Sequence, residues 1–175
     1  MERTLRYCIG SIFILSVLIL CACAEQEDKE VPHDSGSVKE ETILQYARGM
    51  ELYHEGRASE AFDVFESVHR ADPSFIPAIF AAGKAAFINA SYTEAESLFL
   101  EVLELEPRHI DTQKWLSRLL IISGRTAEAE TYLKAALEIS AEDPELLMLL
   151  GQAKQKSGDI EAALSLYRWD EALTE

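Results

Sequence analysis

The strongest constraint on this chain is a period of 34 residues that begins near Thr42 and continues to the last residues. A unit of this length, with a small residue, a turn glycine, an Ala-x3-aromatic step and a closing proline, is typical of a helix–turn–helix repeat. Because such units bury their apolar faces against each other, four of them predict one continuous core. The recurring columns are Gly56, Ala90, Gly124 and Gly158; Ala61, Ala95, Ala129 and Ala163; Phe65, Phe99, Leu133 and Tyr167; and, in two units, Pro73 and Pro107.

Small residues predict where helices approach closely and where they end. Midway along the first helix of each unit, a small residue lets the second helix come near, and these residues are Gly49, Gly83, Ser117 and Gly151. Gly56, Gly124 and Gly158 are expected to end the first helices, because glycine adopts the left-handed conformation without a Cβ clash. Repeat two has Ala90 at this position, and we expect the preceding Asn89 to adopt that conformation instead.

The period predicts eight helices in four pairs and no strand. Asp143 followed by Pro144 predicts a capped helix start. Ser91 and Glu94 have the spacing of a capping box. The expected helix ranges are 38–55 and 58–71, 76–89 and 92–105, 109–122 and 126–139, then 144–156 and 159–172.

This arrangement resembles the tetratricopeptide repeat family over residues 42–175. The resemblance implies an all-α, right-handed superhelical solenoid of four helix–turn–helix repeats within a domain that spans 38–175. It also implies a scaffold that binds a protein or peptide rather than an enzyme. The expected repeats are at about 42–75, 76–109, 110–143 and 144–175.

The amino terminus predicts export. Arg3 and Arg6 precede an apolar run at 8–20, which leads into Leu20-Cys21-Ala22-Cys23. A basic start, an apolar stretch and a small residue before the cut are typical of a secretory signal peptide, here residues 1–22. The stretch Leu20-Cys21-Ala22-Cys23 resembles the bacterial lipobox, which implies that Cys23 is acylated on its thiol. Cys21 is the weaker candidate, because bulky Leu20 would then precede the cut.

The lipobox resemblance also implies a location. Ala24, rather than aspartate, follows Cys23, which implies the periplasmic face of the outer membrane. The alternative is an uncleaved signal anchor, because the largely apolar residues 7–24 are at the lower edge of the length that spans a bilayer. Both interpretations place the repeats outside the cytoplasm, since the arginines stay inside. Residues 23–37 are polar and acidic, and we expect a disordered, lipidated tether.

Composition and spacing argue against several other functions. The net charge of −15 opposes nucleic-acid binding, which requires a basic footprint. All three cysteines lie in the export segment, so the repeats would be stabilised by their core alone. The four histidines are scattered without metal-ligand spacing. We therefore expect no enzymatic activity, no metal and no cofactor.

By resemblance to the family, the first helices line a concave groove that binds the partner. The first helices of repeats two and three carry a net positive charge, whereas glutamates concentrate on the second helix of repeat two. This distribution favours an anionic or C-terminal carboxylate ligand for the groove. The alternative is scattered surface charge, with aromatic side chains that pack between helices. The matching groove positions are Tyr46, Met50, Tyr53, Phe80, Lys84, Phe87, Lys114, Arg118 and Ile121, and in repeat four Met148, Gln152 and Gln155.

Two functional classes remain. Lys114-x-x-x-Arg118 is similar to the carboxylate clamp of chaperone-binding family members, but Tyr46 and Met50 replace the lysine and asparagine of that clamp. The chaperone function is therefore not inferred. The chain is expected to be an exported adaptor for a partner in the cell envelope, or else a ligand-binding accessory of an envelope transport system. An open groove would favour the adaptor, and a deep apolar pocket would favour the accessory.

The carboxyl-terminal end predicts a second contact. Leu166, Trp169 and Leu173 have helical spacing and form an apolar stripe that self-association or a partner would cover. The alternative is that Trp169 packs against the preceding helix. Asp170 and Glu171 stand where a fifth repeat would be met, which favours a solvated end.

Overall fold

The computed structural model describes residues 40–168, which contain eight helices and no strand. All of them belong to one compact unit of the chain. Up to α8 the helix ends agree with the expected ranges to within two residues. The helices are α2 (Glu40–His54), α3 (Ala58–Ala71), α4 (Ile76–Ile88), α5 (Tyr92–Leu105), α6 (Ile110–Ile122), α7 (Thr126–Leu137), α8 (Pro144–Ser157) and α9 (Ile160–Tyr167).

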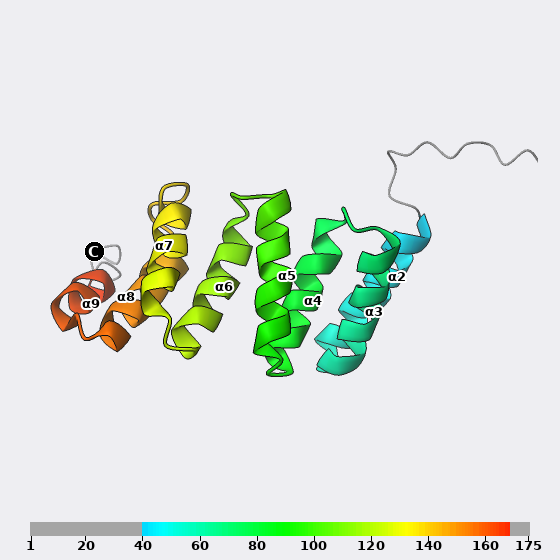
Figure 1. Cartoon of the computed structure of the whole chain (residues 1–175), viewed down its shortest axis with the longest axis horizontal. Coiled ribbons are helices and arrows are strands. Elements are labelled where there is room, and N and C mark those ends of the chain that lie inside the picture. The colour runs from blue at the N-terminus through cyan, green and yellow to red at the C-terminus, as the bar shows by residue number, and fades with distance from the viewer. Residues whose placement is uncertain (1–39, 169–175) are drawn as a thin grey trace, which may run out of the picture. The chain divides into compact units, whose positions relative to one another are not determined.

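The helices form two layers of a repeat array (Figure 1). The first helices of the four repeats are α2, α4, α6 and α8, and the second helices are α3, α5, α7 and α9. In Figure 1, α3 lies in front of α2 and α7 in front of α8. Each helix packs against the next one in the chain, and neighbouring first helices also contact each other. This confirms the all-α solenoid of helix–turn–helix repeats.

The repeated columns of small and aromatic residues form the core between the layers. Phe65 and Phe99 are fully buried, each against the glycine of its own repeat. A Cβ atom on Gly49 would lie 2.5 Å from the Phe65 ring, and one on Gly83 would lie 2.6 Å from the Phe99 ring. The glycines are therefore required by close packing. The buried alanine column is Ala61, Ala95, Ala129 and Ala163.

The turns between paired helices require the left-handed conformation, and in repeat two the prediction was wrong by one residue. Gly56, Gly124 and Gly158 have φ of 78°, 81° and 91°, as expected. In repeat two Ala90 has φ of 60°, while Asn89 keeps φ of −74°. The Asn89 N–H still donates to the Ala85 carbonyl, so the helix continues to this point and the turn keeps the register of the other repeats. Packing thus overrides the local preference of asparagine.

One of the two predicted caps is present. The Asp143 side chain accepts hydrogen bonds from the N–H groups of Glu145 and Leu146, which confirms the capped start of α8. Ser91 makes no side-chain bond to α5, so the capping-box prediction was wrong. Its ψ of 62° differs from the extended conformation of Asp143, whose ψ is 113° and which aims the side chain at the first turn.

Several predicted features lie outside the described residues. These are the signal peptide at 1–22, the tether at 23–37 with Cys23, residues 169–172 of the last expected helix with Asp170 and Glu171, and the contact residues Trp169 and Leu173. Among the described residues, α9 ends at Tyr167, earlier than expected. Within residues 40–168, no helix combines the length and apolar character needed to cross a bilayer.

Candidate partner-binding face

The residues predicted to bind a partner lie on the first helices α2, α4, α6 and α8, and those on α2, α4 and α6 are mostly half-buried. Ile121 is an exception, because it is only 8% exposed and belongs to the hydrophobic core. In repeat four, Met148, Gln152 and Gln155 are exposed. The term first-helix face is used below for the half-buried set, which is Tyr46, Met50, Tyr53, Phe80, Lys84, Phe87, Lys114 and Arg118.

The aromatic side chains of this face pack partly into the core. The Tyr46 ring meets the Phe75 ring edge-on at 5.4 Å between centroids, and the Phe87 ring meets the Trp115 ring in the same way at 5.3 Å. Such pairs are typically worth about 0.5–1.5 kcal/mol beyond the area that they bury. Phe75 and Trp115 were missed by sequence reasoning because neither belongs to a column that recurs every 34 residues. The aromatic side chains therefore have a packing role and retain a partly exposed surface.

Lys84 lies between two aromatic rings that belong to different repeats. Its Nζ atom is 5.0 Å from the ring centroid of Tyr53 on α2 and 5.2 Å from that of Phe80 on α4. A cation over a ring face is attracted by the ring quadrupole. Burial lowers the pKa of Lys84 below its ordinary value, although the charge of Asp111 acts in the opposite direction. The structure therefore holds a partly desolvated ammonium group on this face.

Lys114 and Arg118, by contrast, are paired with carboxylates at the start of α8. The Lys114 Nζ atom lies 2.7 Å from Asp143 Oδ2 and 3.0 Å from Glu145 Oε2. Arg118 forms an ion pair with the other oxygen of Glu145, and its guanidinium lies 5.2 Å from the Trp115 ring centroid. Two cations and two carboxylates thus form a compact, neutral cluster that joins α6 to α8.

This cluster, defined by Lys114, Arg118, Asp143 and Glu145, changes how the charges of the face are understood. Sequence reasoning found its two cations but not its two carboxylates, which lie between 27 and 31 positions further along the chain. The predicted cap at Asp143 is the sequence signal that could have found them. A cap residue lies at the start of α8, and α8 packs beside α6. Of the three predicted cations, only Lys84 lacks an ion-pair partner within residues 40–168.

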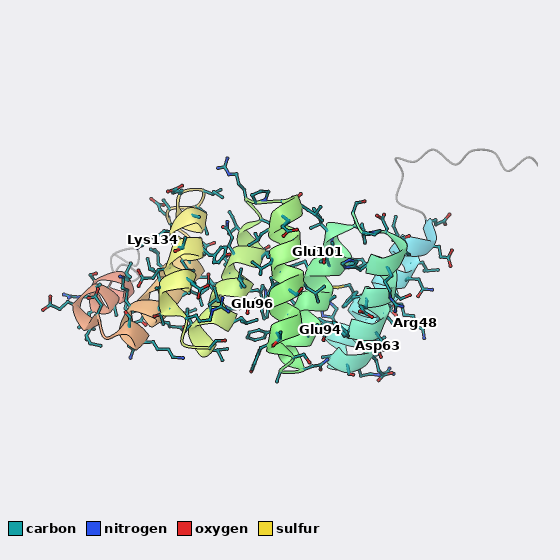
Figure 2. All side chains as sticks on the ribbon, in the orientation of Figure 1. Arg48, Asp63, Glu94, Glu96, Glu101 and Lys134 are labelled. Atoms are coloured by element: carbon teal, nitrogen blue, oxygen red, sulfur yellow. The ribbon has the colours of Figure 1, made fainter. Side chains whose placement is uncertain are left out.

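The acidic residues of α5 lie on the second-helix layer. Glu94, Glu96 and Glu101 project from α5 in Figure 2. Glu96 pairs with Arg125 at 2.6 Å, and Glu101 approaches the Nε2 atom of His69 at 3.1 Å. Two of these glutamates therefore connect neighbouring repeats, so part of the apparent acidic surface has a structural role.

Three hollows formed by described residues are lined largely by charged or polar groups. One, of about 420 Å³, lies between α2 and α3 and is bordered by Arg48, Glu51 and Asp63. Another, of about 400 Å³, lies along α5 beside Glu101 and Glu104. A third, of about 270 Å³, is bordered by Glu41 and Ser67 among others. None of these three is the deep apolar pocket that a lipid-binding accessory would need.

Catalytic and metal-binding features were not expected from the sequence. Within the part of the chain that the structure describes, no three histidine, cysteine or acidic side chains come together in a way that could hold a metal ion.

Comparison with known proteins identifies the type of repeat. Residues 120–168, which include α7, α8 and α9, match the family model described as tetratricopeptide repeat. The fold is that of tetratricopeptide repeats. No curated protein sequence matches the chain.

Solved structures share this fold at low sequence identity. MamA 41-end from Desulfovibrio magneticus RS-1 has a TM-score of 0.70 and 19% identity, over 74% of this chain and 73% of that one. YrrB, described as a TPR protein with an unusual peptide-binding site, has a TM-score of 0.63 and 22% identity, over 72% and 65%. The first TPR of Spaghetti (RPAP3) bound to HSP90 peptide SRMEEVD has a TM-score of 0.64 and 18% identity, over 67% and 93%. These similarities concern the fold alone.

Proposed function

We propose that this chain is an exported, lipid-anchored scaffold of the bacterial cell envelope, which binds a partner peptide or protein on its first-helix face. The observation that carries the proposal is the row of half-buried aromatic side chains on successive first helices, with the partly desolvated Lys84 among them. Rings that are fixed by packing on one side and accessible on the other bind extended peptides at low entropic cost.

The comparisons support a binding function of this kind. Two of the similar structures are described by a peptide-binding site or a bound peptide. The polar lining of the three described hollows favours a partner on an open face over a small apolar ligand in a pocket.

Site-specific photo-crosslinking in bacterial cells tests the binding face. A benzoylphenylalanine at Tyr53 is expected to capture the partner as a covalent adduct, because this side chain is partly exposed on α2. The matched control is the same residue at Glu94, which lies on the second-helix layer (Figure 2). Adducts of equal yield from both positions would assign the binding to another surface.

Metabolic labelling tests the anchor. The change Cys23→Ala is expected to abolish palmitate labelling and to leave the signal peptide uncleaved, because the thiol that accepts the lipid is gone. Cys21→Ala is the matched control and should be labelled like the parent chain. Persistent labelling of the Cys23→Ala chain would place the lipid on another residue, and a parent chain without label would favour the uncleaved signal anchor.

A further inference from the structure

The two halves of the first-helix face differ in their electrostatic state. Around α6, the two cations are neutralised by Asp143 and Glu145, and the Lys114 side chain is only 12% exposed. A ligand carboxylate at this cluster would have to displace one of the chain's own carboxylates. Breaking a partly buried ion pair leaves a charge without its partner, and that cost opposes binding.

Around α4, the positive charge is available. The Lys84 ammonium contacts the faces of Tyr53 and Phe80, and no carboxylate of residues 40–168 forms an ion pair with it. Aromatic faces stabilise the cation only partly and leave its N–H donors without strong acceptors. A carboxylate that approaches the half-buried ammonium would form a charge-assisted hydrogen bond in a medium of reduced polarity, where such bonds are strong.

We propose that the partner is an acidic peptide segment, and that one of its carboxylates is bound by Lys84 between Tyr53 and Phe80. This inference rests on the proposed function of the first-helix face and makes it specific. The neutral cluster around Lys114 and Arg118 has a structural role, because it joins α6 to α8, and it does not bind the ligand anion. Tyr53 and Phe80 position the Lys84 side chain and exclude water from it.

Asp111 allows a second test of the same site, because its negative charge should weaken the binding of a ligand carboxylate to Lys84. It is an exposed residue in the first turn of α6, and it is the carboxylate whose charge acts on Lys84. Because Asp111 repels a ligand carboxylate that approaches Lys84, removing its charge should strengthen binding. The change Asp111→Asn therefore predicts a gain of affinity, which a merely structural role of Lys84 would not produce.

The experiment uses the full chain purified in a mild detergent and a phage-displayed library of random 12-residue peptides. The parent chain is expected to select peptides enriched in aspartate and glutamate. A synthetic peptide from that selection is then titrated by fluorescence anisotropy against Lys84→Met, Lys84→Arg, Asp111→Asn, Tyr53→Ala and two matched controls. Lys134→Met removes one positive charge from α7, and the double change Arg125→Gln with Glu96→Gln removes one charge of each sign from an ion pair on the second-helix layer. Circular dichroism confirms that each variant is folded.

The expected pattern is specific. Lys84→Met loses at least tenfold in affinity, Lys84→Arg retains most of it, Asp111→Asn gains severalfold, and both controls stay within about twofold of the parent. If Lys84→Met binds as tightly as the parent while a Tyr53→Ala variant does not, the face binds peptides but the assignment of the anion to Lys84 is wrong. If Lys134→Met loses as much as Lys84→Met, the attraction is nonspecific. If no peptide is selected, both this inference and the proposed function fail.

Discussion

At the scale of single residues, Ala90 is the one non-glycine residue among 40–168 with a left-handed backbone. Its φ of 60° brings its Cβ close to the backbone, a strain of about 1 kcal/mol for a residue other than glycine. Ala90→Gly is therefore expected to raise the free energy of unfolding by about 0.5–1 kcal/mol, measured by urea denaturation. Ala47→Gly is the control, because Ala47 is exposed within α2 and the same change there should lower stability. Equal effects of the two changes would contradict the argument.

The error at Asn89 shows what residue preferences leave undetermined. Asparagine adopts the left-handed conformation more readily than alanine, so a local rule selects Asn89. In the array, the end of α4 is fixed by the helices that pack around it, and the turn falls on Ala90, in register with Gly56, Gly124 and Gly158. The position in the 34-residue repeat was therefore a better predictor of the left-handed residue than the residue type.

At the scale of helix pairs, the small residue and the aromatic residue of each repeat form a matched pair. Where the first helix has Gly49 or Gly83, the second has Phe65 or Phe99 in contact with it. Repeat three departs at both positions, because it has Ser117 in the first column and the smaller Leu133 in the second, and both are fully buried. A side chain on the first helix is therefore compatible with leucine but not with the aromatic ring.

This pairing predicts a rescue between the two positions of repeat two. Gly83→Ser should destabilise the protein by about 1–3 kcal/mol, because its Cβ would overlap the Phe99 ring. The double change Gly83→Ser with Phe99→Leu reproduces the pair of repeat three. Its loss of stability should be smaller than the sum of the two single losses by about 1 kcal/mol or more. Denaturant midpoints of the four proteins measure this coupling, and additive losses would show that the two positions are independent.

The contact between α6 and α8 predicts a dependence of stability on pH. Burial opposes ionisation of Asp143, but hydrogen bonds from Lys114 and from the backbone outweigh it and hold the pKa of this carboxyl below its ordinary value. The stabilisation is therefore present above the pKa of the unfolded chain, near 3.8, and is lost as the pH falls through the lower pKa of the folded state.

Asp143→Asn tests this dependence, because asparagine retains the cap of α8 but not the charge. At pH 7 the change should lower the free energy of unfolding by roughly 1.5–3 kcal/mol, the usual worth of a hydrogen bond to a charged group. At pH 2.5 the difference between the two proteins should be much smaller. Asp63→Asn is a control on α3, since Asp63 is exposed and forms no ion pair with residues 40–168. If the difference in the free energy of unfolding between the parent and Asp143→Asn does not change with pH, the ion pair is not its cause.

The elements were predictable from the sequence to a greater extent than their contacts. The repeat fixes which residues lie on the first helix and which on the second, so Lys114 and Arg118 were placed on the correct helix. It does not fix which side chain of the next repeat reaches them. Their partners are Asp143 and Glu145, which follow the loop between α7 and α8. This loop lacks the closing proline of the earlier repeats. The neutral state of that half of the face could be known only from the structure.

At the scale of the whole array, the two described ends differ in polarity. Arg48 and Glu51 occupy columns that are buried and apolar in every later repeat, so the face before α2 is solvated. At the other end, Ile160 and Leu164 are each 51% exposed on α9. In the column of Arg48, the buried residues of the later repeats are Ala82, Leu116 and Leu150. In the column of Glu51, they are Ala85, Leu119 and Ala153.

Leu164 marks the same contrast within the second-helix layer. Its column has Glu96 and Glu130 in the two preceding repeats, and each of these forms an ion pair with the repeat that follows it. The last repeat has an exposed apolar side chain at this position instead. Leu166, which the sequence assigned to a terminal stripe, is half-buried and packs against the core. The exposed apolar surface described at this end is therefore formed by Ile160 and Leu164.

These ends predict that the charges on α2 prevent head-to-tail association. The double change Arg48→Leu with Glu51→Ala gives the first face the residues of an internal repeat, which could then receive α9 of a second copy. Such a contact joins two different surfaces and does not close, so it should produce open chains of molecules. Analytical ultracentrifugation of residues 38–175, after circular dichroism has verified their helical fold, should show mass that rises with concentration. Adding Leu164→Glu to the double variant restores the carboxylate of the earlier repeats and should return the protein to its original state. Association that persists with Leu164→Glu would show that α9 is not the surface involved.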